Sequence, residues 1–170
     1  MRMGKERLSR LWNLLMAVAL AAVTGCSSFE KRWREAVAKA PTHPVLGPWE
    51  GSWRSDVNGH AGRLRLIVSA DAASATGDRA DFTYRASWSA LQGTFETKQP
   101  LTFQRNGGWT SEGDWELPAW AGGLYRYRME GSRDAVQATF RARRDYGTFS
   151  FRRPEVPVYH PRPAAGGAGR

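Results

Sequence analysis

The residues best placed to do chemistry are three carboxylates, Glu112, Asp114 and Glu116, that alternate along one segment. Three tryptophans lie in or beside the same segment: Trp109, Trp115 and Trp120. Two carboxylates that flank a cleft are the machinery of enzymes that cleave glycosidic bonds. A carbohydrate-active hydrolase is therefore one candidate function, although the spacing also fits a second explanation.

The second explanation is a charged hairpin face. If residues 109–117 and 124–130 pair as antiparallel strands, matching faces allow a register in which facing residue numbers sum to 240. This register predicts three facing pairs: Asp114 with Arg126, Glu112 with Arg128, and Trp115 with Tyr125. Opposite charges that face each other on an exposed sheet contribute roughly 0.2–1 kcal/mol per pair. We favour this paired outer face over a catalytic role, so the sequence assigns no catalytic residue.

The three histidines, His43, His60 and His160, fall in three separate loops. Their spacing brings no two of them together as metal ligands, and it places none beside a serine as in a catalytic triad. We therefore predict no metal site and no cofactor.

The single cysteine, Cys26, ends a segment with the organisation of an export signal. Four basic residues and one acid lie in Met1–Arg10, and an apolar run follows over Leu11–Val23. That run is shorter than the roughly 20 residues of a membrane-spanning helix. The stretch Val23-Thr24-Gly25-Cys26 resembles the lipobox of bacterial lipoproteins. An ordinary secretory signal or an uncleaved anchor helix is the alternative.

The lipobox resemblance implies cleavage before Cys26 and acylation of its thiol and amine. A residue other than Asp after the cysteine, here Ser27, implies sorting to an outer membrane. We therefore expect an exported protein that is lipid-anchored to a bacterial membrane, with the outer membrane facing the periplasm as the expected location.

Removal of residues 1–25 leaves 145 residues, which suit one domain with its own core. This part holds 21 basic and 15 acidic residues, so its net charge is +6 rather than the +9 of the whole chain. Acylation of the sole cysteine excludes disulfides and cysteine-based redox chemistry. Seven of the eight tryptophans remain, which indicates large buried or binding surfaces.

The acylated tether, residues 26–48, contains a predicted amphipathic helix over Ser27–Ala40. Its apolar stripe is Phe29, Trp33 and Val37, and prolines end it at Pro41 and Pro44. We expect this stripe to pack on the following domain rather than to lie on lipid.

Residues 49–153 then follow a period of two, with turn signals between short apolar runs. Eight strands are predicted: Trp49–Asp56, Arg63–Ser69, Ala80–Trp88, Thr94–Gln104, Trp109–Leu117, Leu124–Glu130, Ala135–Arg143 and Thr148–Arg153. Pro100 is expected to mark a bulge or an edge position within the fourth strand, with Leu101 and Phe103 both pointing inward. One face is apolar throughout and the other carries the charges. We predict an all-β fold, an antiparallel up-and-down barrel, with a β-sandwich as the alternative. Residues 154–170 are predicted to be a disordered tail.

The motif Gly51-Ser52-Trp53 on the first strand resembles the calycins, the group that includes lipocalins, fatty-acid-binding proteins and avidins. The resemblance implies a lipocalin-like barrel that binds small apolar ligands. It also implies that Arg152 or Arg153, near the last strand, stacks over the tryptophan and closes the barrel floor.

We expect a non-catalytic, membrane-tethered barrel that binds a small apolar ligand or an envelope component. The candidate wall residues are Trp53, Tyr84, Trp88, Tyr125 and Tyr127. The second candidate is a structural or assembly protein of the envelope with a filled barrel, since the interior holds enough large side chains to fill it.

A basic outer face is also predicted: Arg63, Arg65, Arg85, Arg141 and Arg143. Export makes nucleic acid an improbable partner for this face, so anionic lipid headgroups or cell-wall polymer are the candidates.

Overall fold

The computed structural model describes residues 28–39, 41–89, 91–116 and 123–155, apart from the side chains of Trp88 and Leu91. One helix covers residues 28–37, and the rest is built from strands. The strands are β1 (Gly47–Ser55), β2 (Ala61–Ala70), β3 (Arg79–Trp88), β4 (Leu91–Pro100), β5 (Thr102–Phe103), β6 (Trp109–Glu116), β7 (Leu124–Gly131), β8 (Ala135–Ala142) and β9 (Tyr146–Arg152).

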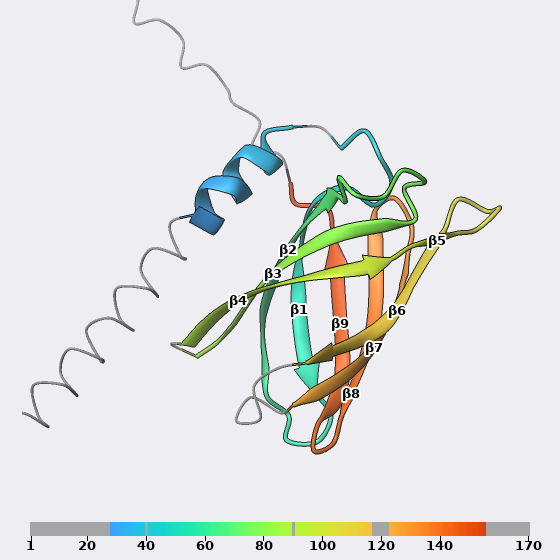
Figure 1. Cartoon of the computed structure of the whole chain (residues 1–170). Helices are drawn as coiled ribbons and strands as arrows, with labels where there is room; N and C mark the ends of the chain where they lie inside the picture. The colour runs from blue at the N-terminus through green and yellow to red at the C-terminus, as the bar shows by residue number, and fades with distance from the viewer. Residues whose placement is uncertain (1–27, 40, 90, 117–122, 156–170) are drawn as a thin grey trace, which may run out of the picture.

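The strands form one antiparallel sheet in the order β4-β3-β2-β1-β9-β8-β7-β6-β5 (Figure 1). Except for β4 and β5, strands that follow each other in the chain pair with each other, and β1 pairs with β9, so the sheet curls into a nearly closed barrel. The predicted all-β, up-and-down barrel preceded by a short helix is confirmed.

The segment around Pro100 differs from the prediction of one bulged strand, which is wrong. β4 pairs with β3 as far as Pro100, whereas β5 pairs with β6. A proline has no N–H group with which to continue a ladder. The chain therefore turns at Leu101, whose N–H donates to the Asp78 carbonyl at 2.7 Å and whose side chain is buried. Phe103 is carried outward to 47% exposure instead of pointing inward.

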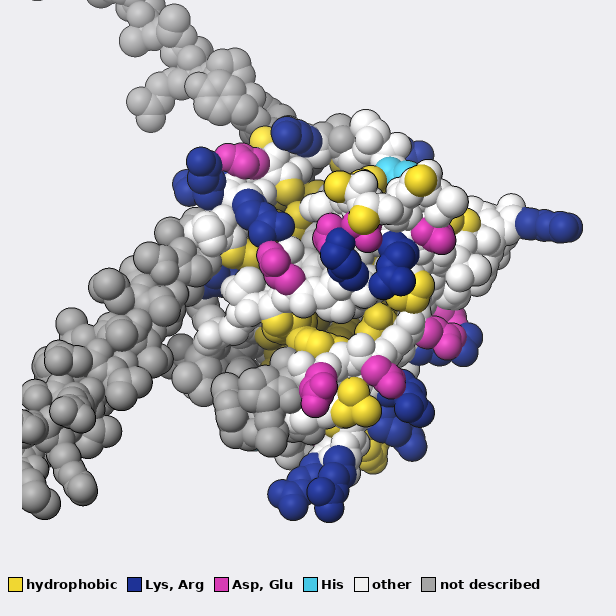
Figure 2. All heavy atoms as spheres, viewed as in Figure 1, with side chains coloured by type: hydrophobic (Ala, Val, Ile, Leu, Met, Phe, Trp, Pro, Cys, Tyr) yellow, Lys and Arg dark blue, Asp and Glu magenta, His cyan; other side chains and the backbone are white. Residues whose placement is uncertain are grey.

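The barrel wall is incomplete between β4 and β6, and we call this gap the seam. Among the described residues, β4 forms a ladder only with β3, and β6 forms ladders only with β7 and β5. Figure 2 shows hydrophobic side chains gathered in a band along this gap, with charged side chains on both sides of it. The ring is thus completed by the turn at Leu101 and by side chains, not by a backbone ladder.

One end of the barrel is covered by the segment before β1, and we call it the closed end. Val45 and Trp49 are fully buried there, and the indole Nε1 of Trp49 donates to the Val45 carbonyl at 2.8 Å. Gly47 has φ of +103°, which favours glycine, and a Cβ at this position would lie 3.3 Å from Nη1 of Arg153. The positive φ and the close approach to Arg153 both favour glycine at residue 47.

The N-terminal helix packs on the outside of the barrel against β2 and β3 (Figure 1). Phe29 and Trp33 are buried with Ile67, so the predicted apolar stripe packs on the domain. Glu30 accepts from Nη1 of Arg65 at 3.0 Å, and Arg32 pairs with Glu96 at 2.9 Å. Both apolar and charged contacts hold the helix in place.

Candidate ligand site at the open end of the barrel

Burial of the inward side chains falls from the closed end to the opposite end, which we call the open end. Near the closed end Phe82, Trp109 and Phe151 are 0–3% exposed. At the open end, where β1 finishes and β7 begins, Trp53 and Tyr125 are only partly buried. Because alternate residues of every strand point inward, these partly buried rings belong to the inner face of the barrel.

A row of aromatic rings crosses the interior toward the open end. The ring centroids are 4.9 Å apart for Tyr84 and Phe95, 3.8 Å for Phe95 and Trp115, and 6.2 Å for Trp115 and Tyr125. The row continues through Phe140 to Phe149, with a centroid distance of 4.9 Å between these two. Aromatic pairs at these spacings contribute roughly 0.5–1.5 kcal/mol beyond their buried area. The row therefore forms a continuous aromatic surface inside the barrel.

We call the partly buried members of this surface the aromatic ledge: Trp53, Phe95, Trp115, Tyr125 and Phe149. The rings of Phe95 and Trp115 meet across the seam, one from β4 and the other from β6. The ledge thus reaches both the open end and the gap in the wall.

A buried polar network lies beneath the ledge. Nε2 of Gln99 donates to the Tyr84 hydroxyl at 2.9 Å, and the Ser111 hydroxyl donates to Oε1 of Gln99 at 3.3 Å. The Tyr84 hydroxyl also contacts the Met129 sulfur at 3.5 Å. The Gln99–Ser111 bond joins β4 to β6, so it bridges the seam where the backbone ladder is missing.

Burial raises the pKa of the tyrosine hydroxyls around this network. Burial is the main cause at Tyr84, Tyr125 and Tyr127, because the phenolate form loses its hydration in the interior. All three hydroxyls are therefore neutral at physiological pH, where they can donate or accept a hydrogen bond but cannot act as phenolate bases.

The structure places four of the five predicted wall residues, at two depths. Trp53 and Tyr125 belong to the ledge, and Nε1 of Trp53 donates to the Ser87 carbonyl at 3.3 Å. Tyr84 and Tyr127 lie deeper, at 3% and 6% exposure, while the side chain of Trp88 is outside the described residues. Phe95, Trp115 and Phe149 complete the ledge but were not predicted as site residues. Their positions in the alternating pattern already predicted that they point inward, so this pattern could have identified them.

The predicted stacking of an arginine on Trp53 needs correction. The guanidinium carbon of Arg153 lies 3.6 Å from the ring centroid of Trp49. The β1–β9 register pairs Glu50 with Arg152, which brings residue 153 beside residue 49 rather than residue 53. Gly47-Pro48-Trp49 is also a Gly-x-Trp motif. This motif, rather than Gly51-Ser52-Trp53, lies at the closed end of the barrel. Arg152 instead points outward, 3.6 Å from Glu50.

Two glycines on the strands, Gly51 and Gly113, leave no free space beside them. At Gly113, a Cβ would lie 2.5 Å from the Tyr127 hydroxyl, which already occupies that volume. At Gly51, a Cβ would lie 1.7 Å from the Ser150 carbonyl oxygen of β9. In the described part of the chain, the three pockets we identify all involve outward-facing side chains and lie outside the wall.

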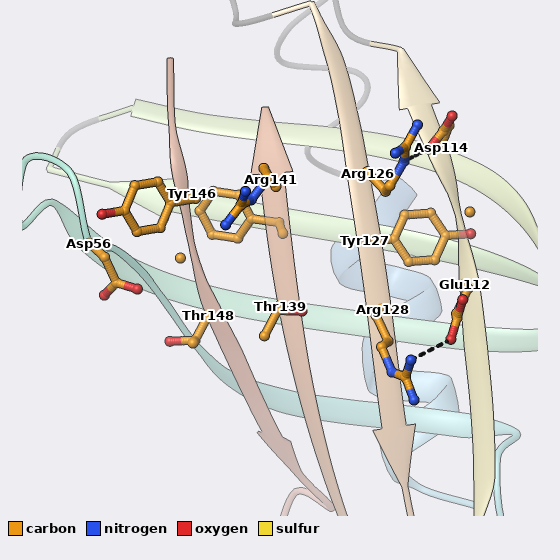
Figure 3. A pocket seen from close by; sticks show the side chains of 13 residues that line it. Asp56, Glu112, Asp114, Arg126, Tyr127, Arg128, Thr139, Arg141, Tyr146 and Thr148 are labelled. Atoms are coloured by element: carbon orange, nitrogen blue, oxygen red, sulfur yellow. Dashed lines mark hydrogen bonds and ion pairs between the residues drawn. The ribbon is translucent and has the colours of Figure 1, made fainter. Parts of the chain in front are cut away.

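The largest of these pockets, about 780 Å³, is an open groove on the outer face of β6–β9 (Figure 3). The predicted register is confirmed there: Asp114 faces Arg126, Glu112 faces Arg128, and Trp115 faces Tyr125. Nε of Arg126 lies 3.1 Å from Asp114, and Nη1 of Arg128 lies 3.1 Å from Glu112. The two acids form ion pairs with their neighbours on the sheet.

The predicted basic face divides into two groups. Arg63, Arg65 and Arg85 lie on β2 and β3 beside the helix, whereas Arg141 lies on β8, across β1 and β9 from them. Arg85 is only 8% exposed because the helix covers it. A single continuous basic face is therefore not present on these strands.

No protein-family model and no curated protein matches this chain. Among solved structures, a fluorescence-activating β-barrel designed de novo is similar, with 18% identity over 65% of this chain and 94% of that chain. The TM-score of that match is 0.42.

The described residues include no helix long and apolar enough to cross a membrane. The same residues contain no group of three His, Cys, Asp or Glu side chains arranged to hold a metal ion. Cys26, the predicted lipidation site, and Trp120 lie outside the described residues.

Proposed function

We propose that this protein is an exported lipoprotein, anchored through Cys26, whose barrel binds a small apolar ligand on the aromatic ledge without catalysing a reaction. The observation that carries the ligand proposal is the loss of burial toward the open end. Large aromatic side chains seldom stay partly exposed together unless they form a contact surface. The N-terminal sequence supports the anchor.

The ledge favours a flat or elongated apolar ligand over a bulky one. The interior below the ledge is occupied by the Gln99–Tyr84–Ser111 network, so a ligand lies against the rings rather than deep in the barrel. Neutral tyrosine hydroxyls supply the few polar contacts that orient a ligand in an apolar site.

The test is native mass spectrometry of the protein extracted from membranes, followed by titration with the apolar dye N-phenyl-1-naphthylamine. We expect a co-purified small molecule, and dye binding that Trp115→Gln weakens about tenfold. Tyr146→Gln, which alters an aromatic ring on the outer groove, is the control and leaves dye binding unchanged. Absence of both a co-purified molecule and dye binding contradicts the ligand proposal.

A Cys26→Ala variant tests the anchor separately. We expect it to leave the membrane fraction, and retention there contradicts anchoring through this residue.

A structural or assembly role in the envelope is the second candidate. The filled closed half of the barrel and the outward position of the identified pockets favour it. Under this alternative the Trp115→Gln variant keeps its fold but loses a protein partner. A carbohydrate-active enzyme is the third candidate, and the ion pairs of Glu112 and Asp114 count against it.

A further inference from the structure

A small polar pocket lies on the outer face of the barrel, between the N-terminal helix and strands β2–β4. It has a volume of about 130 Å³ and is lined by Glu30, Arg63, Arg65, Arg85, Ser87 and Gln92. Three guanidinium groups and one carboxylate therefore meet around it, which leaves two positive charges in excess.

The one carboxylate is shared between two of these arginines. Glu30 accepts from Arg65 at 3.0 and 3.1 Å, and its Oε1 lies 3.7 Å from Nε of Arg85. In the described part of the chain, Arg63 forms no ion pair. Arg85 is 8% exposed and sits over the Phe29 ring, and its Nη2 donates to Gln92.

The size and chemistry of the pocket suit one tetrahedral oxyanion. At about 30 Å³ per water molecule, its volume holds roughly four waters, the number of oxygens in a phosphate group. Arginine binds phosphate oxygens through paired N–H donors, and Ser87 and Gln92 can supply further polar contacts.

The position of the pocket indicates where such an anion comes from. Glu30 is four residues from Cys26, and four extended residues span at most about 14 Å. An acyl chain on Cys26 would hold that residue at the bilayer surface, where the headgroup layer is roughly 5–8 Å thick on each side. The pocket then lies within reach of the headgroups of neighbouring lipids.

We propose that the pocket formed by Arg63, Arg65, Arg85 and Glu30 binds a phosphate group, and that its source is an anionic phospholipid headgroup in the membrane that holds the anchor. The choice of source rests on the proposed anchoring through Cys26, whereas the oxyanion site rests on the pocket itself. Bound in this way, the headgroup orients the side of the barrel that carries the helix toward the bilayer.

The experiment is native mass spectrometry of the full-chain gene product, extracted from membranes into neutral detergent with equal amounts of phosphatidylglycerol and phosphatidylcholine. We expect at least fivefold more bound phosphatidylglycerol than phosphatidylcholine. Arg63→Gln should reduce this ratio to near one, and Arg143→Gln, the same charge change in the β8–β9 turn, should leave it unchanged. Glu30→Gln should raise the ratio, because it removes the anion that competes for the arginines.

A further measurement adds inorganic phosphate at the concentration of phosphatidylglycerol. The lipid should stay bound; complete displacement shows that free phosphate is the ligand and overturns the lipid source. A ratio near one in the unchanged protein overturns the proposal of an anionic headgroup, because phosphatidylcholine also carries a phosphate group. A ratio that Arg63→Gln does not alter overturns the site at these arginines. The protein mass in the same spectra reports acylation. An unacylated protein that still prefers phosphatidylglycerol contradicts the anchor alone, and an acylated protein without preference contradicts the pocket alone.

Discussion

Arg153 lies over the indole ring of Trp49, with its guanidinium carbon 3.6 Å from the ring centroid. The same guanidinium donates to five carbonyl oxygens: those of His43, Pro44, Leu46, Pro48 and Arg133. Burial lowers its pKa to about 10, so it remains charged at neutral pH. One side chain thus ties the segment before β1 to the last strand.

The first prediction concerns this contact. Arg153→Ala removes the stacking and leaves several carbonyls without a donor, so it should lower the free energy of unfolding by about 3 kcal/mol. Arg152→Ala, the matched control, removes one exposed ion pair and should cost less than about 1 kcal/mol. Urea unfolding of both variants measures the difference. Equal losses would mean that Arg153 does not hold the closed end.

The second prediction compares two strand glycines. A Cβ at Gly51 would lie 1.7 Å from the Ser150 carbonyl oxygen, whereas a Cβ at Gly93 meets no atom within 4 Å. Gly51→Ala should force β1 and β9 apart and destabilise the barrel by about 2 kcal/mol or more. Gly93→Ala should stabilise it slightly, by up to about 1 kcal/mol, because alanine reduces the entropy of the unfolded chain. Thermal melts of the two variants should therefore shift in opposite directions.

The third prediction concerns the buried amide of Gln99. Gln99→Leu leaves the Tyr84 hydroxyl without its donor and removes the hydrogen bond that crosses the seam. The expected loss of unfolding free energy is about 1–3 kcal/mol. Gln137→Leu, on the exposed face of β8, should change it by less than about 0.5 kcal/mol. If Gln99→Leu is as mild as Gln137→Leu, the polar network does not stabilise the seam.

The fourth prediction is a pH dependence at the closed end. The hydrogen bond from Lys98 is the main cause that lowers the pKa of Asp71 below its ordinary value of 3.8. A carboxyl whose pKa is lowered by folding stabilises the protein above its unfolded pKa, and this contribution disappears as the pH falls through the folded value. Asp71→Asn should therefore be less stable than the unchanged protein at pH 7, and this difference should shrink progressively as the pH falls below about 4. A stability difference that persists at pH 2 would assign the effect to packing instead of charge.

Local rules were sufficient for much of the fold. The alternation of apolar and polar residues along each strand predicted which side chains point inward. Matching these faces between two strands then predicted the β6–β7 register, including the Asp114–Arg126 pair. These inferences succeed because side chains alternate strictly along a strand and because facing charges must match.

Contacts between distant segments were not predictable in the same way. Trp49 and Trp53 are four residues apart on one strand, so both point to the same face of the sheet. The β1–β9 register decides which of the two rings lies under Arg153, and this register joins residues about 100 positions apart. Likewise, the burial of Arg85 depends on where the helix docks, and the apolar stripe of that helix does not specify its partner strands. Similarly, the missing N–H of Pro100 predicts that a ladder is interrupted but not that the chain crosses to β6.

The seam gives the barrel an unusual mechanical freedom. Elsewhere around the ring, widening the wall requires breaking a ladder of backbone hydrogen bonds. Between β4 and β6, the described contacts include the Phe95–Trp115 and Tyr84–Trp115 ring pairs and the Gln99–Ser111 hydrogen bond. In the described part of the chain, the wall along this line is therefore held by side chains, so the stability of the seam depends on the residues chosen at these positions and not on the backbone.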